Sequence, residues 1–139
     1  MSLHSLRELN MATVSTPIRV RYSEVDSMKW ANHGAYARWF EVGRAELMRK
    51  QGLTYKALEE MGYYLPITEM HCKYLKPIIY DDYIQVATTP SAVKKASMRF
   101  EYELSKDGTV MARGYTSHVC LDENARIVRI PEPMLRILL

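Results

Sequence analysis

A long amphipathic helix is the strongest pattern in the chain. Between residues 33 and 50, apolar positions recur at spacings of three and four, as they do along one face of an α-helix. Those positions are Tyr36, Trp39, Phe40, Gly43 and Leu47. Asn32 precedes the pattern as a candidate N-cap, and Gly52 follows it as a C-terminal stop. We therefore expect one helix, roughly 27 Å long, to lie across the rest of the fold.

Strand patterns fill most of the remaining sequence. One, at 18–22, precedes the long helix, and a second short helix is expected at 54–61. Later strands are expected at 63–75, 83–89, 97–105 and 110–121, with a short one at 127–130 and a terminal helix at 131–139. Asp107-Gly108 is a strong hairpin turn. This order predicts an α+β fold in which one antiparallel sheet carries the long helix across one face.

The composition is that of one ordinary globular domain. The chain has 139 residues, 47% of them hydrophobic and 25% charged, which excludes a wholly disordered protein. No apolar run approaches the roughly 20 residues of a membrane span. The net charge of +3 is spread along the chain, so no nucleic-acid partner is expected. We expect residues 1–16 to form a flexible leader and residues 17–139 a single domain.

The predicted sheet leaves one of its faces uncovered, because a single long helix covers only the other. Tyrosine, methionine and β-branched residues occur on both faces of the expected strands. A second copy of the chain would either cover the free face or extend the sheet at an edge. The pattern therefore predicts a homo-oligomer, a dimer or a tetramer.

Several kinds of chemistry are excluded by what the sequence lacks. It has no glycine-rich phosphate loop, no nucleophilic serine motif and no zinc-protease motif. The four histidines lack metal-ligand spacing, so neither a metal nor another cofactor is expected. Cys72 and Cys120 make no disulfide scaffold, which favours a cytoplasmic protein with reduced thiols.

The segment between the first strand and the long helix holds the best candidate chemistry. It carries Glu24, Asp26 and His33 next to the helix amino end, where unpaired N–H groups and the helix dipole can stabilise an oxyanion. A nearby carboxylate could attack a polarised carbonyl carbon or activate water. The residues alone also allow the alternative that Asp26 and Asn32 are only loop and capping residues.

Three stretches of the chain resemble one family of enzymes. The first is Tyr22-Ser23-Glu24-Val25-Asp26, followed seven residues later by His33 and then by Tyr36 and Trp39-Phe40-Glu41. The others are residues 73–82 and residues 115–122. Together they resemble the acyl-CoA thioesterases of the 4-hydroxybenzoyl-CoA thioesterase family over residues 17–130. The resemblance implies the hotdog fold, an antiparallel sheet wrapped around one long central helix.

The resemblance also implies roles for residues around the helix start. Asp26 would be the catalytic carboxylate, and the backbone N–H at His33 would face the thioester oxygen, beside Gly34 in the substrate site. The His33 side chain would position substrate or water, the alternative being a helix-start hydrogen bond only. Tyr22 would pack against or orient Asp26. The chain departs from the family at Lys29, where many members carry glycine, and a side chain there would narrow the acyl pocket or bring charge to its mouth.

Further residues are candidates for holding the substrate. Trp30, Tyr36 and Trp39 are candidates for lining the acyl pocket, although aromatic residues at helical spacing are also ordinary core. The resemblance implies that Lys94 and Lys95 contact the nucleotide end of coenzyme A. The alternative for this pair is a solvated hairpin turn.

The sequence therefore predicts an enzyme that hydrolyses a short-chain or aromatic acyl-CoA to free acid and coenzyme A. Asp26 would serve as nucleophile or as general base, between which the sequence does not choose. Two other functions remain open at this point. One is hydrolysis of acyl carrier protein thioesters, and the other is non-catalytic acyl binding on the same fold.

Overall fold

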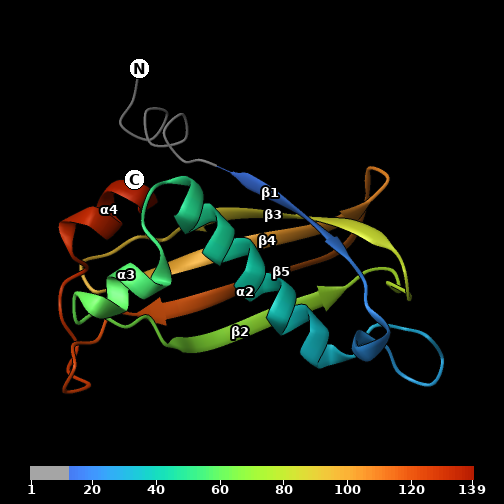
Figure 1. Cartoon of the computed structure of the whole chain (residues 1–139), viewed down its shortest axis with the longest axis horizontal. Helices are drawn as coiled ribbons and strands as arrows, with labels where there is room; N and C mark the ends of the chain where they lie inside the picture. Colours follow the sequence, from blue (N-terminus) through green and yellow to red (C-terminus); the bar gives the residue numbers. More distant parts are fainter. Residues whose placement is uncertain (1–12) are drawn as a thin grey trace.

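The computed structural model describes residues 13–139, which form one antiparallel sheet crossed by one long helix (Figure 1). The strands are β1 (Val14–Arg19), β2 (Ile67–Tyr74), β3 (Tyr83–Ser91), β4 (Ser97–Lys106) and β5 (Thr109–Val119). The helices are α2 (His33–Lys50), α3 (Tyr55–Glu60) and α4 (Glu132–Leu138), and η1 (Tyr22–Glu24) is a 3-10 turn. The strand order is β1-β3-β4-β5-β2, and every neighbouring pair is antiparallel. This confirms the α+β arrangement predicted from the sequence.

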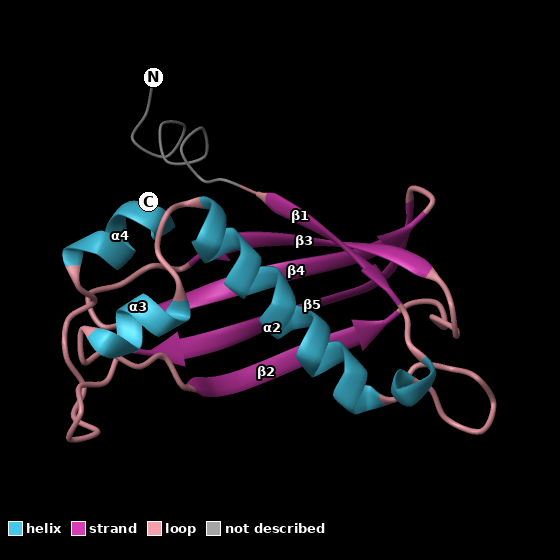
Figure 2. Ribbon diagram, viewed as in Figure 1, coloured by secondary structure: helices cyan, strands magenta, loops and turns pink. Residues whose placement is uncertain are grey.

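Helix α2 lies obliquely across one face of the sheet, with α3 and α4 beyond its carboxyl end (Figure 2). Its bounds confirm the predicted helix, and the Asn32 side chain caps it by accepting a hydrogen bond from the Ala35 N–H at 2.9 Å. All five predicted apolar positions are buried against the sheet. Gly43 allows this close packing, because a Cβ there would lie 2.4 Å from the Thr88 Oγ1.

Several elements differ from the sequence prediction, including the first strand and the segment at 127–130. Strand β1 begins at Val14, so the end of the predicted leader belongs to the sheet, and residues 1–12 lie outside the described residues. The strand predicted at 127–130 is wrong, because only a single bridge, Leu121 to Ile127, forms there. The backbone groups of this segment bond to separate partners instead, as when the Ile130 N–H donates to the Lys95 carbonyl at 2.8 Å. The β-forming side chains therefore do not produce a ladder.

The sheet face turned away from α2 is polar. Along β4, buried side chains alternate with the outward-facing Arg99, Glu101 and Glu103, and the last pairs with Arg113 of β5 at 3.3 Å. This face is less apolar than expected from the sequence. The edge strand β2 is the more exposed feature, because Ile67, Met70 and Tyr74 each keep more than a third of their surface in solvent.

A chain of buried polar groups crosses the core between β4, β5 and the loop before β2. The Tyr102 hydroxyl lies 2.6 Å from the Thr116 Oγ1, which lies 2.8 Å from the His118 Nε2. The His118 Nδ1 lies 2.9 Å from the Leu65 carbonyl. Since a carbonyl oxygen only accepts, Nδ1 carries the hydrogen, and the neutral ring accepts from Thr116 at Nε2. Burial lowers the pKa of His118 to about 4.

Stability is therefore expected to fall as the pH falls from about 6.5 towards 4. An unfolded histidine titrates near its ordinary pKa of 6.5, whereas folded His118 stays neutral down to about 4, so the unfolded state takes up the proton first. The free energy of unfolding should decrease by up to about 3 kcal/mol across this window. Urea unfolding of the wild type and of His118→Gln at pH 7 and pH 4.5 measures the effect. An equal loss in both proteins would contradict this assignment.

Candidate active site

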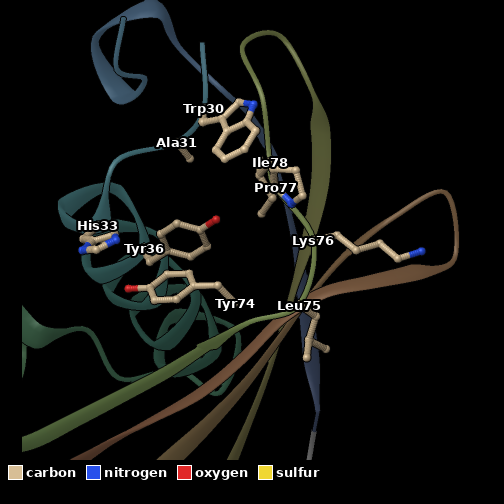
Figure 3. A pocket seen from close by; sticks show the side chains of 9 residues that line it. All are labelled: Trp30, Ala31, His33, Tyr36, Tyr74, Leu75, Lys76, Pro77 and Ile78. Atoms are coloured by element: carbon tan, nitrogen blue, oxygen red, sulfur yellow. The ribbon is translucent and has the colours of Figure 1, made fainter. Parts of the chain in front are cut away.

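A cavity of about 290 Å³ opens between the amino end of α2 and the segment that follows β2 (Figure 3). One wall comes from the chain just before and within the first turn of the helix, and the other from residues 74–78. The lining residues are Trp30, Ala31, His33, Tyr36, Tyr74, Leu75, Lys76, Pro77 and Ile78. The structure thus brings together three residues that the sequence analysis singled out: Trp30, His33 and Tyr36.

Aromatic rings form the inner part of this cavity. The His33 and Tyr74 rings are stacked with centroids 5.1 Å apart, and the Tyr36 ring meets Tyr74 edge-on at 4.7 Å. Figure 3 shows these three rings grouped together, while the Lys76 side chain extends away from them. Burial, and to a smaller extent the neighbouring Cys72 and Tyr74, raise the pKa of Tyr36 to about 12. Its hydroxyl therefore stays protonated and able to donate a hydrogen bond at neutral pH.

The amino end of α2 supplies free hydrogen-bond donors beside the cavity. The Ala35 N–H bonds to Asn32, but among residues 13–139 the N–H groups of His33 and Gly34 donate no hydrogen bond. His33 lines the cavity, and its side chain is exposed, whereas Gly34 lies just outside the lining. The helix dipole adds a partial positive charge at this end. Such a site can stabilise negative charge on a carbonyl oxygen.

Asp26 lies in an exposed loop next to this cavity rather than in its lining. Its Oδ1 accepts hydrogen bonds from the Met28 N–H at 2.9 Å and the Trp30 N–H at 3.2 Å. Its own N–H donates to the Trp30 carbonyl at 2.8 Å. Oδ2 has no hydrogen-bond partner within the described part of the chain. Trp30 is therefore the link between the carboxylate and the cavity, and one carboxylate oxygen remains available for chemistry.

Lys29 lies in the same loop, in a backbone conformation that glycine adopts without strain. Its backbone φ is 68°, in the left-handed region that costs a residue with a side chain about 1–2 kcal/mol. The Lys29 Nζ donates to the Tyr22 hydroxyl at 2.7 Å and lies 4.4 Å from the centre of that ring. This hydrogen bond and the ammonium charge lower the pKa of Tyr22. Tyr22 thus contacts the Asp26 loop through Lys29.

Lys94 and Lys95 lie at the opposite end of the sheet from Asp26. Strand β3 starts beside the Asp26 loop, where the Tyr80 N–H donates to the Lys29 carbonyl at 3.0 Å. It then runs for nine residues, or about 30 Å, before the two lysines. Lys94 lines a separate hollow of about 240 Å³ together with Arg99, Ser97 and Ser117. Within one chain, the lysine pair and the aromatic cavity are therefore separate sites.

Trp39 is a core residue rather than a cavity-lining one. It is 1% exposed, its ring meets Tyr36 edge-on at 5.0 Å, and it is not among the residues that line the cavity. Its indole Nε1 donates to the Glu24 Oε2 at 2.9 Å. No separate role for Glu24 was predicted from the sequence. A signal for it existed, because a buried tryptophan needs an acceptor for its N–H.

The Cys72 thiol near the cavity is excluded as a nucleophile by its buried environment. Burial raises the pKa of the Cys72 thiol to about 11, so little thiolate forms at neutral pH.

Between Thr13 and the carboxyl terminus, no group of three or more His, Cys, Asp and Glu side chains is arranged to hold a metal ion. Over the same residues, no helix is both long and apolar enough to cross a membrane.

The chain is similar in sequence and structure to known thioesterases. The profile of the thioesterase-like superfamily matches residues 20–138. The acyl-CoA thioesterase YbgC of Haemophilus influenzae is 28% identical over 109 residues, which cover 78% of this chain and 80% of that protein. A DHNA-CoA thioesterase from Staphylococcus aureus is 31% identical, with a TM-score of 0.81 over 84% of this chain and 80% of that chain. A hypothetical protein from Aquifex aeolicus is 29% identical, with a TM-score of 0.88 over 91% and 99% of the two chains.

Proposed function

Since the chain belongs to the thioesterase-like superfamily and has the hotdog fold, it is a thioester hydrolase. We propose that it hydrolyses short-chain or aromatic acyl-CoA at the amino end of α2. One observation carries the proposal. An aromatic cavity opens directly onto a helix start whose first two N–H groups have no acceptor among residues 13–139. A thioester carbonyl fits such a place, because its oxygen gains negative charge in the transition state.

The proposed reaction uses the amino end of α2 and the loop that precedes it. The thioester oxygen accepts hydrogen bonds from the N–H groups of His33 and Gly34. Asp26, through its free Oδ2, either attacks the carbonyl carbon or takes a proton from the water that attacks it. The carbon–sulfur bond then breaks, and coenzyme A leaves as a thiolate that is protonated by solvent. In the covalent route, water afterwards cleaves the anhydride formed on Asp26.

The two roles of Asp26 are distinguished by oxygen-18. In a single turnover in labelled water, the covalent route transfers label into the Asp26 carboxylate when the anhydride is cleaved at the aspartyl carbon. Direct attack by water places label only in the product acid, as does cleavage of the anhydride at the acyl carbon, so label in Asp26 is the result that identifies the covalent route. Mass spectrometry of the peptide that contains Asp26 reads out the difference.

The cavity favours a small acyl group with a flat ring. A volume of about 290 Å³ is at the lower end of the range for small-molecule sites. Its aromatic walls, formed by Trp30, Tyr36 and Tyr74, offer stacking and edge contacts to a ring. The DHNA-CoA thioesterase among the similar structures acts on an acyl group of this kind, which supports the choice.

A panel of acyl-CoA substrates tests the proposed function. Release of free thiol would be measured for straight chains of increasing length and for aromatic acyl groups. We expect the highest kcat/KM for aromatic or short acyl groups and a steep decline for long chains. Absence of hydrolysis across the whole panel, with binding retained, would overturn the proposal in favour of an acyl-binding protein.

The proposal includes an assembly in which a second copy completes the substrate site. Lys94 and Lys95 are too far from Asp26 in one chain to hold the other end of the same substrate. Among residues 13–139 strand β2 pairs only with β5, so its outer edge and the exposed side chains of Met70 and Tyr74 are open to another copy. Because β2 lies at the edge of the sheet, a dimer in which the sheet extends into the second copy is favoured. Light scattering at micromolar concentration should give at least the mass of a dimer.

Replacing Lys94 with Ala is expected to raise KM severalfold and to leave kcat nearly unchanged. The lysine would contact phosphate at the exposed end of coenzyme A, away from the reacting bond, so its loss affects binding only. The effect should shrink at high ionic strength, because contacts between exposed charges are screened. Steady-state kinetics at low and high salt measure both. An unchanged KM at low salt would remove Lys94 from the site.

A further inference from the structure

Glu24 is a buried carboxylate that takes no part in the proposed chemistry. It is only 2% exposed, although it lies two residues before Asp26. Its Oε1 accepts a hydrogen bond from the Arg21 N–H at 2.8 Å, and its Oε2 accepts one from the Trp39 Nε1 at 2.9 Å. We propose that Glu24 is a positioning residue that fixes the Asp26 loop against helix α2. This inference rests on the proposed function and deepens it.

Glu24 connects three parts of the site. Through Arg21 it closes the η1 turn from which the Asp26 loop departs. Its backbone carbonyl accepts the Asn32 N–H at 2.9 Å, which holds the helix cap in place. Through Trp39 it is anchored to the second turn of α2, and the Trp39 ring contacts Tyr36, which lines the cavity. The carboxylate loop, the donor N–H groups and the cavity wall therefore share one buried anchor.

Only a carboxylate satisfies this position. Both partners are N–H groups that donate and never accept, so the side chain must offer two acceptor oxygens. Glutamine has one acceptor oxygen and an NH₂ group, which would have to face either Arg21 N–H or Trp39 Nε1. A buried donor facing a donor is unfavourable and displaces one of the two segments. The exposed Arg21 guanidinium also lies 3.5 Å from Oε1 and adds an ion pair to these two hydrogen bonds.

The test is a mutant cycle between Glu24 and Trp39. Glu24→Gln is expected to lower kcat about tenfold to a hundredfold with a smaller change in KM, since a misplaced catalytic group costs rate more than ground-state binding. In a Trp39→Phe background the glutamine NH₂ no longer faces an indole donor. Glu24→Gln should then cost at most about twofold beyond Trp39→Phe alone. Glu103→Gln, which breaks an exposed ion pair on the outer sheet face, is the matched control and should leave kcat unchanged.

A second measurement distinguishes a positioning role of Glu24 from a general loss of stability. It also tests that role independently of the proposed function. All variants are assayed at least 15 °C below their melting temperatures, and amide NMR follows the N–H groups of Met28 and Trp30, which bond to Asp26. Glu24→Gln should shift both signals, and Glu103→Gln should shift neither. A wild type without thioesterase activity would refute the proposed function, and the amide shifts alone would then decide the role of Glu24. Unshifted amides, or a kcat of folded Glu24→Gln within about twofold of wild type, would overturn the inference.

Discussion

Replacing Asp26 with Asn should lower kcat for acyl-CoA hydrolysis at least about a hundredfold and leave KM nearly unchanged. The asparagine Oδ1 can still accept the hydrogen bonds from Met28 and Trp30, so the loop keeps its shape. The group that replaces Oδ2 is an NH₂, which neither attacks a carbonyl carbon nor takes a proton from water. The loss should therefore appear in the chemical step.

The chain contains a matched control for this substitution. Asp122 lies in a loop near the end of β5, and its Oδ1 accepts hydrogen bonds from Asn124 N–H at 2.8 Å and Arg126 N–H at 3.0 Å. Asp122→Asn makes the same chemical change in the same kind of loop without touching the cavity. It should leave kcat unchanged. If Asp26→Asn retained more than about a tenth of the wild-type kcat, Asp26 would lose its catalytic role.

Replacing Gly114 with Ala should lower the free energy of unfolding by about 2–3 kcal/mol. Gly114 lies on β5 between β2 and β4, directly under the Phe40 ring of α2. An added Cβ would lie 2.4 Å from the His71 carbonyl oxygen and 2.7 Å from the Phe40 Cζ. A backbone atom of the neighbouring strand cannot move aside as a flexible side chain could, so the helix or the edge strand must shift.

Thermal unfolding measures this effect, with Gly34→Ala as the control. A Cβ at Gly34 would make only ordinary contacts, at 3.5 Å and 3.6 Å, and alanine is the better helix former. Gly34→Ala should leave the melting temperature unchanged or raise it. Gly114→Ala should lower it by roughly 10 °C. Equal melting temperatures for the two variants would mean that helix and sheet are less tightly packed than the structure shows.

The parts of the fold that the sequence predicted well are those with local causes. Helix α2 was predicted within a residue, because its cap at Asn32 and its repeating apolar face both lie within the segment itself. The Asp107-Gly108 turn is of the same kind, since both residues adopt the positive φ that this dipeptide favours in a hairpin. The strand predicted at 127–130 failed for the opposite reason. Its side chains favour a strand, but its backbone hydrogen bonds go one at a time to Cys120, just after β5, and to Lys95, far away in the sequence.

The candidate site shows the same contrast between features with local causes and features that depend on distant residues. The segment from Tyr22 to Tyr36 was recognised because it is continuous in sequence and leads into a helix start. The opposite cavity wall, residues 74–78, was missed because it meets His33 and Tyr36 across some forty residues of chain. Glu24 was noticed as an acid but not as an anchor, because its role depends on Trp39 being buried. Such a pairing follows from packing, which no single segment encodes.

The central claim is that the thioester carbonyl lies against the first N–H groups of α2. A crystal structure of Asp26→Asn with an aromatic acyl-CoA bound tests it most directly. We predict that the carbonyl oxygen lies about 2.7–3.2 Å from the backbone nitrogen of His33, of Gly34 or of both, with the acyl ring between Tyr36 and Trp30. An acyl-CoA bound with its carbonyl oxygen beyond hydrogen-bond distance of both nitrogens would contradict the account.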